Sequence, residues 1–455
     1  MKDYFKQSLV PVLFFIISAV TLGSLYIQNY GPKSLGDYDM HIYNTYAVAT
    51  GQLSGKFIVN NQKNGIKEMM IQGPSDELTL NGANFIYEPM VLHPFTKSKE
   101  YSLQKKSYNN TPANMTNVPV RTQYPFINWV PQAIGYNIAK HFGASIWGMW
   151  QGARIGNLAI YVILVAIAIV IIPNGRWILA LIGSFPLSVF LSSSLSGDAL
   201  NISISTLFVA YVLHLRMNSL RSTQISKKQI SVLIIFTLLL FSLKVAYVPL
   251  LIIILAIPNR YYSFKKKVSS IGGSGILGLL IYLIWSHKYA TVLQSFDNLN
   301  ANVTFIKEHI GQAVFAIFSQ TILIPFKFLS EIDQPGSATT LGFLTVSFII
   351  VITIVLFLSH KEELTISPSA SLKDCLSLFY PIILAVGAYL MAVGLTEAAL
   401  LVSWTKVYPG GKTFDITDIQ GFQARYLLPL APLTLMIYGV SDQFSCKKRV
   451  CEKTK

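Results

Sequence analysis

Long apolar runs dominate this sequence, and eight of them contain roughly twenty or more mainly apolar residues. A helix needs about 20 such residues to cross the ~30 Å hydrocarbon core of a bilayer. The runs therefore predict an all-α polytopic membrane protein of about ten helices, with one integral membrane domain over residues 1–455. They cover residues 8–28, 145–172, 177–196, 199–217, 268–286, 341–359, 377–402 and 424–441.

The charge content supports this class of protein. Only 13% of the residues are charged, about half of the ~25% typical of soluble domains, and 52% are hydrophobic, which excludes an ordinary soluble enzyme. Lys and Arg number 36 and Asp and Glu number 21, for a net charge of +15. Because the basic residues lie in short segments between apolar runs, they favour contact with a membrane surface, and we expect no nucleic-acid partner.

The basic residues also predict an orientation, since short loops rich in Lys and Arg stay in the cytoplasm. This rule places both termini, including the basic tail at 442–455, on the cytoplasmic side of the plasma membrane. The first run is too long for a secretory signal and is interpreted as an uncleaved anchor. The loop residues that carry the argument are Lys2, Lys6, Arg176, Arg216, Arg221, Lys227, Lys228, Arg260, Lys265, Lys266, Lys267, Lys361 and Lys373.

A ninth apolar segment, 230–257, has basic residues on both flanks and contains Lys244 near its centre. The flanks favour a short hairpin that leaves and re-enters on the same side. The alternative is one tilted helix with Lys244 in mid-membrane, which costs about 2.5–3.5 kcal/mol and reverses every later loop. A further apolar segment, 311–329, lies between two external stretches and is expected to be re-entrant or interfacial.

The largest hydrophilic region is 29–123, which the orientation makes an extracytoplasmic loop between the first two spans. A short alternating run at 85–87 predicts a small β element within it. The aromatic, proline-broken segment 124–132 that follows is typical of chain lying in the membrane interface. The three cysteines, Cys375, Cys446 and Cys451, fall on the cytoplasmic side and cannot build a disulfide framework.

Acidic residues gather just outside the first span, at Asp37 and Asp39, where the pattern predicts a helix that includes His41. Asp37 and His41 are four residues apart and share a helical face, whereas Asp39 points elsewhere. Asp37 suits a helix N-cap, and Asp39 suits a solvated surface. An acid at this level is also where a general base for chemistry at the membrane surface would lie.

Other polar residues converge on the same outer level. Asp198 ends a serine-rich turn between two spans, where it either caps the next helix or faces the first acidic cluster. Arg425 precedes the last span, where it either snorkels to the interface or binds a phosphate with its planar fork. Arg154 and Lys244 could add positive charge there. Glycine-rich phosphate loops, HExxH and Cys/His metal spacings are absent from the sequence, so ATP hydrolysis is not expected. No cofactor is certain, although paired acids make a divalent cation possible.

In their order and spacing these segments resemble a bacterial multispanning membrane family, the domain of unknown function 2142, which is placed near the GT-C superfamily of membrane glycosyltransferases. The resemblance covers most of the chain. Tyr38 stands where the family usually has Glu, the neighbouring Asp39 is the acid that would substitute for it, and Ala424 replaces a Gly. The matching residues are Asp37, His41, Tyr43, Tyr46, Gly51, Pro131, Gln132, Ala133, Arg154, Asn157, Asp198, Lys244, Gln423, Arg425 and Tyr426.

The resemblance implies an enzyme that moves a sugar from a polyprenyl-phosphate carrier to a surface glycan or glycolipid on the external face. On that hypothesis Asp37 or Asp39 deprotonates the acceptor hydroxyl. Arg425, with Lys244 or Arg154, neutralises the departing polyprenyl phosphate. The acceptor would be oriented by His41, Tyr43, Tyr46 and Asp198.

Two other functions remain open from the sequence. A transporter or flippase of a lipid-linked glycan would line a path through the bundle with Arg154, Lys244 and Arg425. A polymerase or ligase of surface polysaccharide would share the external site and differ mainly in its acceptor.

Overall fold

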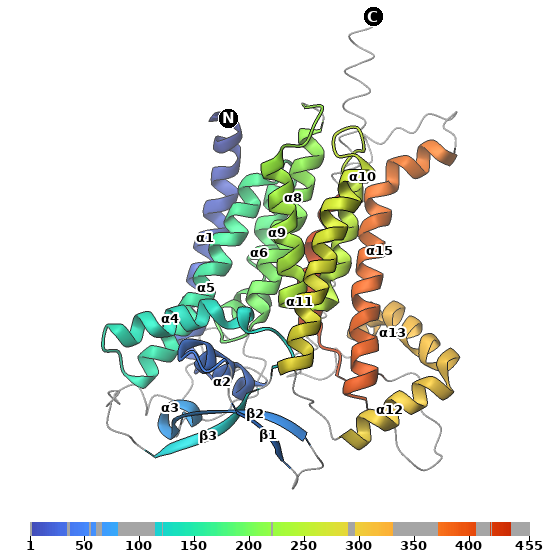
Figure 1. The fold of residues 1–455 in the computed structure, drawn as a ribbon. Helices are drawn as coiled ribbons and strands as arrows, with labels where there is room; N and C mark the ends of the chain where they lie inside the picture. Colours follow the sequence, from blue (N-terminus) through green and yellow to red (C-terminus); the bar gives the residue numbers. More distant parts are fainter. Residues whose placement is uncertain are drawn as a thin grey trace, which may run out of the picture.

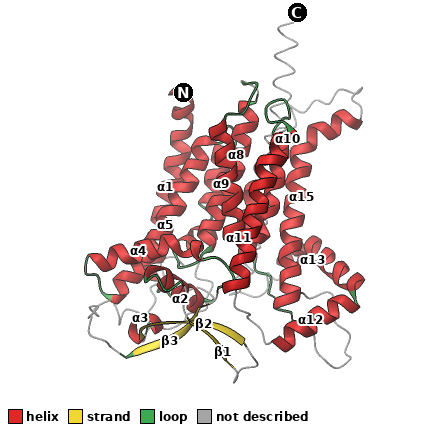
Figure 2. Ribbon diagram, in the orientation of Figure 1, coloured by secondary structure: helices red, strands yellow, loops and turns green. Residues whose placement is uncertain are grey.

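The protein is a helical bundle with a small sheet and several short helices at one end (Figures 1 and 2). The structure is a computed structural model. The residues it describes are 2–33, 37–53, 56–60, 66–80, 114–120, 122–219, 222–289, 296–330, 372–405, 419 and 421–437.

Five helices are long and apolar enough to cross a membrane within the described residues. They confirm five of the predicted spans, whereas run 341–359 lies outside the described residues. Four of the five spans lie in single helices: α1 (Lys2–Asn29), α5 (Ile146–Ile171), α8 (Asp198–Asn218) and α15 (Leu372–Ser403). The fifth span consists of three consecutive elements: α10 (Phe264–Lys267), η4 (Val268–Gly272) and α11 (Gly273–Tyr289).

Helix α8 lies at the centre of the bundle. In its most apolar stretch 78% of the residues are buried, against 11% for the segment that contains α11. α8 packs against α5 and against η6 (Ala424–Ile437). The first turn of α8 is therefore surrounded by protein, and this is where Asp198 lies.

Two predicted spans are not regular α-helices. Run 177–196 is divided into α6 (Arg176–Gly183) and α7 (Pro186–Ser192), because Pro186 has no N–H to continue the helical hydrogen bonds. Run 424–441 is a 3₁₀ segment over its described part, η6, with Pro429 and Pro432 inside it. Prolines at these positions prevent an uninterrupted α-helical ladder.

The segment 230–257 forms the predicted hairpin, and the alternative of one tilted helix is wrong. α9 (Lys227–Leu243) leads to Lys244 in an extended conformation, after which η3 (Val245–Ala256) returns. The two ends of the hairpin meet, since the Ile225 N–H donates to the Tyr261 carbonyl at 3.0 Å. The Tyr261 hydroxyl also donates to Oε1 of Gln229 at 2.9 Å. Lys244 is consequently at the tip.

The predicted outer loop contains α2 (Tyr38–Ala49), α3 (Ser75–Thr79) and an antiparallel sheet of β1 (Lys56–Asn60), β2 (Ile66–Pro74) and β3 (Met115–Val120). The strand order is β1-β2-β3, with Met69 opposite Val120. Val118 and Val120 are buried in a cluster with Ile42 and Trp150, which attaches the sheet to α2 and to the bundle. The run at 85–87 lies outside the described residues.

Two further pairs of elements widen this end. η2 (Phe126–Trp129) continues into α4 (Val130–His141), which lies crosswise to the bundle (Figure 1). α12 (Phe296–Glu308) and α13 (Ile310–Ser330) pack beside α15. The apolar segment 311–329 lies within α13 and is therefore helical.

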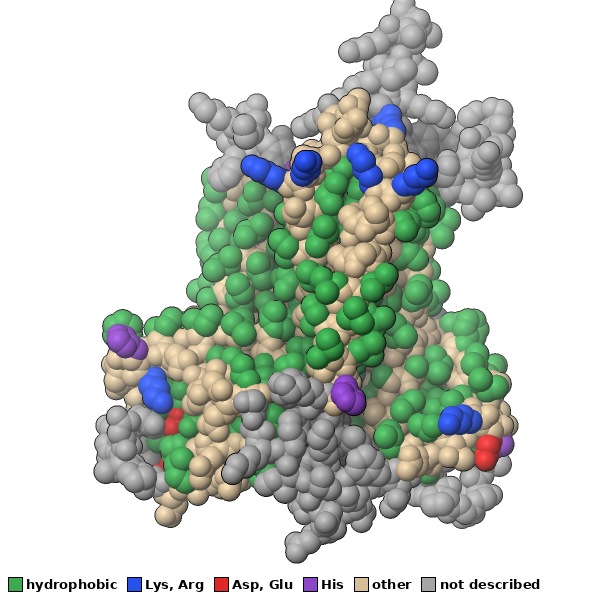
Figure 3. Space-filling model, viewed as in Figure 1, with side chains coloured by type: hydrophobic (Ala, Val, Ile, Leu, Met, Phe, Trp, Pro, Cys, Tyr) green, Lys and Arg blue, Asp and Glu red, His purple; other side chains and the backbone are tan. Residues whose placement is uncertain are grey.

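Basic side chains gather at the other end of the bundle, where α1 begins (Figure 3). The first turn of α9 and the short helix α10 supply basic residues there, including Lys227, Lys228 and Lys265. The predicted tail at 442–455 lies outside the described residues.

Candidate functional site

A cavity of about 530 Å³ opens among the helix ends at the sheet end of the bundle. Its walls combine acidic, basic, amide and aromatic side chains with a group of leucines. The polar lining includes Asp37, His41, Asn128, Asp198, Asn201, Lys244 and Arg425. The aromatic and apolar lining includes Tyr124, Trp129, Tyr282, Leu299, Leu395, Leu400, Trp404 and Tyr426.

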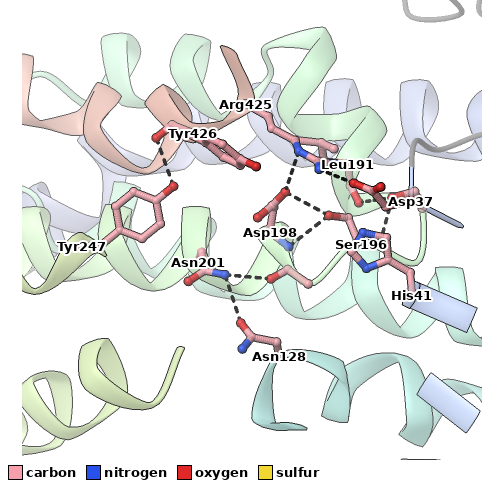
Figure 4. Close-up of polar contacts among 12 residues, drawn as sticks. Asp37, His41, Asn128, Leu191, Ser196, Asp198, Asn201, Tyr247, Arg425 and Tyr426 are labelled. Carbon is pink, nitrogen blue, oxygen red and sulfur yellow. Dashed lines mark hydrogen bonds and ion pairs between the residues drawn. The ribbon is translucent and has the colours of Figure 1, made fainter. Parts of the chain in front are cut away.

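Arg425 links the two predicted acids, Asp37 and Asp198 (Figure 4). Its Nη2 lies 3.2 Å from Oδ2 of Asp37, and its Nε lies 3.5 Å from Oδ2 of Asp198. One guanidinium thus faces two carboxylates in different settings. Arg425 and Asp198 are mostly buried, with side chains 13% and 16% exposed, so each of these charges needs its partner, whereas the Asp37 side chain is 40% exposed. The three residues come from the loop after α1, the start of α8 and the start of η6.

Asp37 stands at the predicted N-cap of α2 but does not cap the helix with its side chain. Its backbone has φ 58°, a left-handed conformation that is uncommon for residues other than glycine. The capping interpretation is therefore wrong for Asp37, and its carboxylate is directed to Arg425 instead.

The serine-rich turn before α8 is held by amide donors from two neighbouring helices. Gln132 Nε2 donates to the Ser196 carbonyl at 3.0 Å, and Asn157 Nδ2 donates to the carbonyls of Ser194 and Ser196 at 3.0 Å each. Ser196 Oγ in turn donates to Oδ2 of Asp198 at 3.3 Å. These bonds place the Asp198 carboxylate opposite Arg425.

Lys244 lies among three tyrosine rings at the tip of the hairpin. Its Nζ is 3.8 Å from the ring centroid of Tyr426 and 5.5 Å from those of Tyr124 and Tyr247. Aromatic faces attract a cation and leave its charge available to an anion in the cavity. The ammonium group is therefore held in the cavity wall although the side chain is buried.

Asn128 connects Lys244 to the start of α8. Its Nδ2 donates to the carbonyl of Leu243 at 3.1 Å, and its Oδ1 accepts from Asn201 Nδ2 at 3.0 Å. Asn201 is one turn into α8, on the same side as Asp198. The amide pair thereby sets the spacing between the cation at the hairpin tip and the acid on α8.

His41 is a neutral hydrogen-bond donor at pH 7. Burial, assisted by the positive charge of Arg425, lowers the pKa of His41 to about 4. Its Nδ1 accepts a hydrogen bond from Trp129 Nε1 at 3.2 Å, so the ring proton belongs on Nε2. Nε2 is buried without a hydrogen-bond partner among the described residues. This arrangement suits donation to a ligand oxygen better than proton abstraction.

The aromatic side of the cavity depends on a close backbone contact. Gly421 has φ 93°, and a Cβ at this position would lie 2.4 Å from Cδ1 of Trp404. Trp404 therefore lies directly on the chain that leads to Arg425.

Burial and the nearby Asp198 raise the pKa of Tyr124 to about 12, so its phenol stays protonated.

Arg154 does not line the cavity, which corrects its predicted phosphate-binding role. It is buried and donates to the carbonyls of Ser193 at 2.7 Å, Tyr26 at 3.0 Å and Tyr30. Two of these carbonyls belong to the last turn of α1 and the residue after it, where a cation is favoured by the helix dipole. Arg154 therefore joins α1 to the serine-rich turn.

Asp39, Tyr43 and Tyr46 also lie outside the cavity lining. Asp39 is in the first turn of α2 on another face from Asp37 and His41. Tyr43 is half-buried against the sheet cluster, and Tyr46 packs edge-to-face with Tyr136, 6.3 Å between centroids. Both tyrosines thus have packing contacts outside the cavity, and the orienting role expected for them stays a prediction.

Sequence reasoning did not single out Asn201 or Tyr247. Asn201 is a polar residue three positions after Asp198 inside an apolar run, and this spacing was an available signal. Tyr247 lies three residues after Lys244, and its hydroxyl donates to the Tyr426 carbonyl at 3.0 Å. Only the return of η3 beside η6 reveals that contact.

Metal binding receives no direct support from the part of the chain that the structure describes. Within it, no group of three or more His, Cys, Asp or Glu side chains could hold a metal ion. Asp37 and Asp198 are paired with Arg425. The possible divalent cation stays a prediction.

An apolar bundle with a charged cavity at one end defines a polytopic membrane protein. Over residues 21–434 the chain matches the family described as "Predicted membrane protein (DUF2142)", and it belongs to that family. No curated protein and no solved structure matches it.

Proposed function

We propose that the protein is a GT-C-like glycosyltransferase of the plasma membrane. It moves a sugar from a polyprenyl-phosphate carrier to a cell-surface glycan or glycolipid on the external face. The observation that carries the proposal is the presence of two acids, Asp37 and Asp198, and two cations, Arg425 and Lys244, in a single cavity that also has an apolar side. These are the groups that sugar transfer from a lipid phosphate requires.

The external orientation rests on the positive-inside rule. Basic side chains gather at the end of the bundle remote from the cavity (Figure 3), and such residues mark the cytoplasmic side. The cavity then opens at the external leaflet, where a lipid-linked donor presents its phosphate. Both termini are cytoplasmic in this arrangement.

The cations suit the donor phosphate. Lys244 and Arg425 approach the cavity from the hairpin tip and from η6, and positive charge positioned in advance stabilises a departing phosphate. Leu299, Leu395 and Leu400 form an apolar part of the same wall, which suits the polyprenyl chain. Aromatic rings such as Trp404 and Tyr426 offer faces against which a sugar can stack.

The ion pair between Asp37 and Arg425 gives the reaction an order. Before the donor binds, Arg425 holds the Asp37 carboxylate. A donor phosphate competes for Arg425, and the released Asp37 can then accept a proton. Asp198 keeps a negative charge beside Arg425 and prevents it from leaving the site.

In the transfer step, Asp37 takes the proton of the acceptor hydroxyl. The acceptor oxygen forms a bond to the anomeric carbon while the bond from that carbon to the phosphate oxygen breaks. The polyprenyl phosphate leaves with the electron pair, next to Lys244 and Arg425. His41 Nε2–H can donate to a sugar or phosphate oxygen in the cavity.

A flippase is the less favoured function, because the charged lining belongs to element ends at one end of the bundle. Asp37 precedes α2, Asp198 begins α8, Lys244 follows α9 and Arg425 is the second residue of η6. A transport path would need such groups along the bundle. A polysaccharide polymerase or ligase would use the same cavity with a longer acceptor.

The test compares two acids that lie two positions apart, Asp37 just before α2 and Asp39 in its first turn. In cells lacking the native gene, Asp37→Asn and Arg425→Ala should abolish the surface sugar and cause the polyprenyl-phosphate donor to accumulate. Asp39→Asn is the matched control and should behave as wild type, since Asp39 is outside the cavity lining. A lost general base lowers the rate by about 100-fold or more.

The readouts are the surface glycan composition and the amount of lipid-linked sugar, both measured by mass spectrometry. Equal amounts of each variant must reach the membrane. Wild-type glycan in both cavity variants contradicts the transferase. Transfer that persists in Asp37→Asn once donor is supplied on the cavity side would instead favour a flippase.

A further inference from the structure

Helix α4 carries an apolar stripe on its exposed side. Val130, Ile134, Ile138 and Phe142 follow one another at intervals of four residues and are 39%, 55%, 54% and 81% exposed. Phe142 comes directly after the helix, at its outer tip. Such a stripe on the surface of a protein marks a contact with another apolar phase or partner.

The opposite side of α4 is clamped to α5, so the stripe cannot turn inward. A Cβ on Gly135 would lie 2.1 Å from the carbonyl oxygen of Gly152, and one on Gly156 would lie 2.4 Å from the carbonyl oxygen of Pro131. The two helix backbones are therefore in direct contact through glycines. The exposure of the stripe is built into this crossing.

The surroundings of α4 indicate lipid as the occupant of the stripe. The bundle beside it exposes an apolar belt, to which α5 contributes Ile155 and Ile163. Figure 3 shows hydrophobic side chains continuing from the bundle onto the lobe that contains α4. α4 lies crosswise to the spanning helices at the edge of this belt (Figure 1).

The charges of α4 agree with this position. Lys140 and His141 are in its last turn, beside Phe142. A helix with one apolar side and basic residues at its end is suited to the boundary between lipid headgroups and acyl chains.

We propose that α4 is an interfacial helix whose stripe enters the headgroup–acyl boundary of the leaflet at which the cavity opens. Its partner is the lipid of that leaflet. α4 follows η2, which carries Asn128 and Trp129, and Gln132 of α4 holds the turn before Asp198. The depth of α4 in the lipid thereby sets the height of the cavity above the acyl chains.

The test measures the depth of single side chains. In a chain with Cys375, Cys446 and Cys451 changed to serine, the variants Phe142→Cys and Ile138→Cys carry an environment-sensitive fluorophore. The protein is reconstituted in vesicles of phosphatidylcholine and phosphatidylglycerol that contain lipids with a nitroxide either just below the headgroup or near the chain end. Ile163→Cys and Asn117→Cys are the controls, because both positions are exposed. Ile163 lies on the spanning helix α5, whereas Asn117 lies on strand β3 of the sheet outside the bundle.

Fluorophores at 138 and 142 should be quenched most by the shallow nitroxide, that at 163 by the deep nitroxide, and that at 117 by neither. The use of two positions guards against a local effect of one label. The proposal is overturned if neither nitroxide quenches the fluorophores at 138 and 142, as expected for position 117. Shielding of both positions from lipid and from aqueous iodide, or disulfide formation between two chains at 142, would also overturn it in favour of a protein partner. Sugar transfer is not used in this test, so its outcome is independent of the proposed function.

Discussion

At the residue scale, Arg425 is the central group, because a single side chain serves two carboxylates. Its Nη2 and Nε point in different directions from one rigid plane, toward Asp37 and Asp198 (Figure 4). A lysine would bring the same charge without this fork. We therefore expect the spacing of the two acids to depend on the guanidinium as well as on its charge.

His41 predicts a pH dependence of stability. The unfolded chain takes up a proton on this imidazole below pH about 6.5, whereas the folded protein does so only near pH 4. The contribution of His41 to the free energy of unfolding is therefore fully present above pH 6.5. It is lost as the pH decreases toward 4, by at most about 3 kcal/mol.

The measurement is thermal unfolding in detergent between pH 4 and pH 8, for wild type and His41→Asn. The fall below pH 6.5 should be smaller in the variant, since asparagine does not titrate. An identical slope in both proteins would mean that His41 is not the group responsible.

Asn128 predicts a loss of stability from the replacement of a single heavy atom. In Asn128→Asp the donor to the Leu243 carbonyl is replaced by an oxygen, which leaves that acceptor unpaired beside a buried charge. The cost should be about 1–3 kcal/mol or more. Asn117→Asp, at an exposed strand position, is the control and should leave the unfolding temperature nearly unchanged.

At the element scale, the irregular segments have functions that regular helices could not perform. The chain reversal at Lys244 brings its ammonium group to the cavity, and the turn before α8 brings Asp198 there. η6 begins with Ala424 and Arg425, just after Gly421. Each charged residue of the cavity thus lies where a helix starts, ends or reverses.

Gly421→Ala should disturb the cavity through η6. The alanine methyl would meet Trp404 at 2.4 Å, and the backbone at φ 93° is strained for any residue with a Cβ. We expect a loss of about 1–3 kcal/mol in stability and a displaced Arg425. Gly387→Ala within α15 has nothing within 4 Å of its added methyl and should be neutral or stabilising, because alanine favours helix. Equal unfolding temperatures for the two variants would contradict this account.

At the scale of the whole molecule, the position of the sheet and of the basic starts of α9 and α10 at opposite ends of the bundle makes the orientation testable. In a cysteine-free chain, Asn117→Cys on β3 should react with an impermeant thiol reagent on intact cells. Lys228→Cys at the start of α9 should react only after permeabilisation. The reverse pattern would place the cavity in the cytoplasm and remove the basis for an external transferase.

The sequence by itself determined the membrane class, most of the spans, the hairpin at 230–257 and the expected orientation. These properties follow from the hydrophobicity of about 20 consecutive residues and from loop charges, which are local quantities. The lengths of runs 177–196 and 424–441 suggested regular spans, and Pro186, Pro429 and Pro432 are the sequence signal for their departure from α-helix that this prediction did not use.

The tertiary structure decided which polar residues meet. Asp37 and Arg425 are 388 positions apart, and only the packing of α2, α8 and η6 joins them. Arg154 looked equivalent to Arg425 in the sequence, yet the end of α1 supplies carbonyls that occupy its donors. A side chain's charge is encoded locally, but its partners depend on how distant elements pack, and this packing separated Arg425 and Lys244 in the cavity from Arg154 and Tyr46 in the framework.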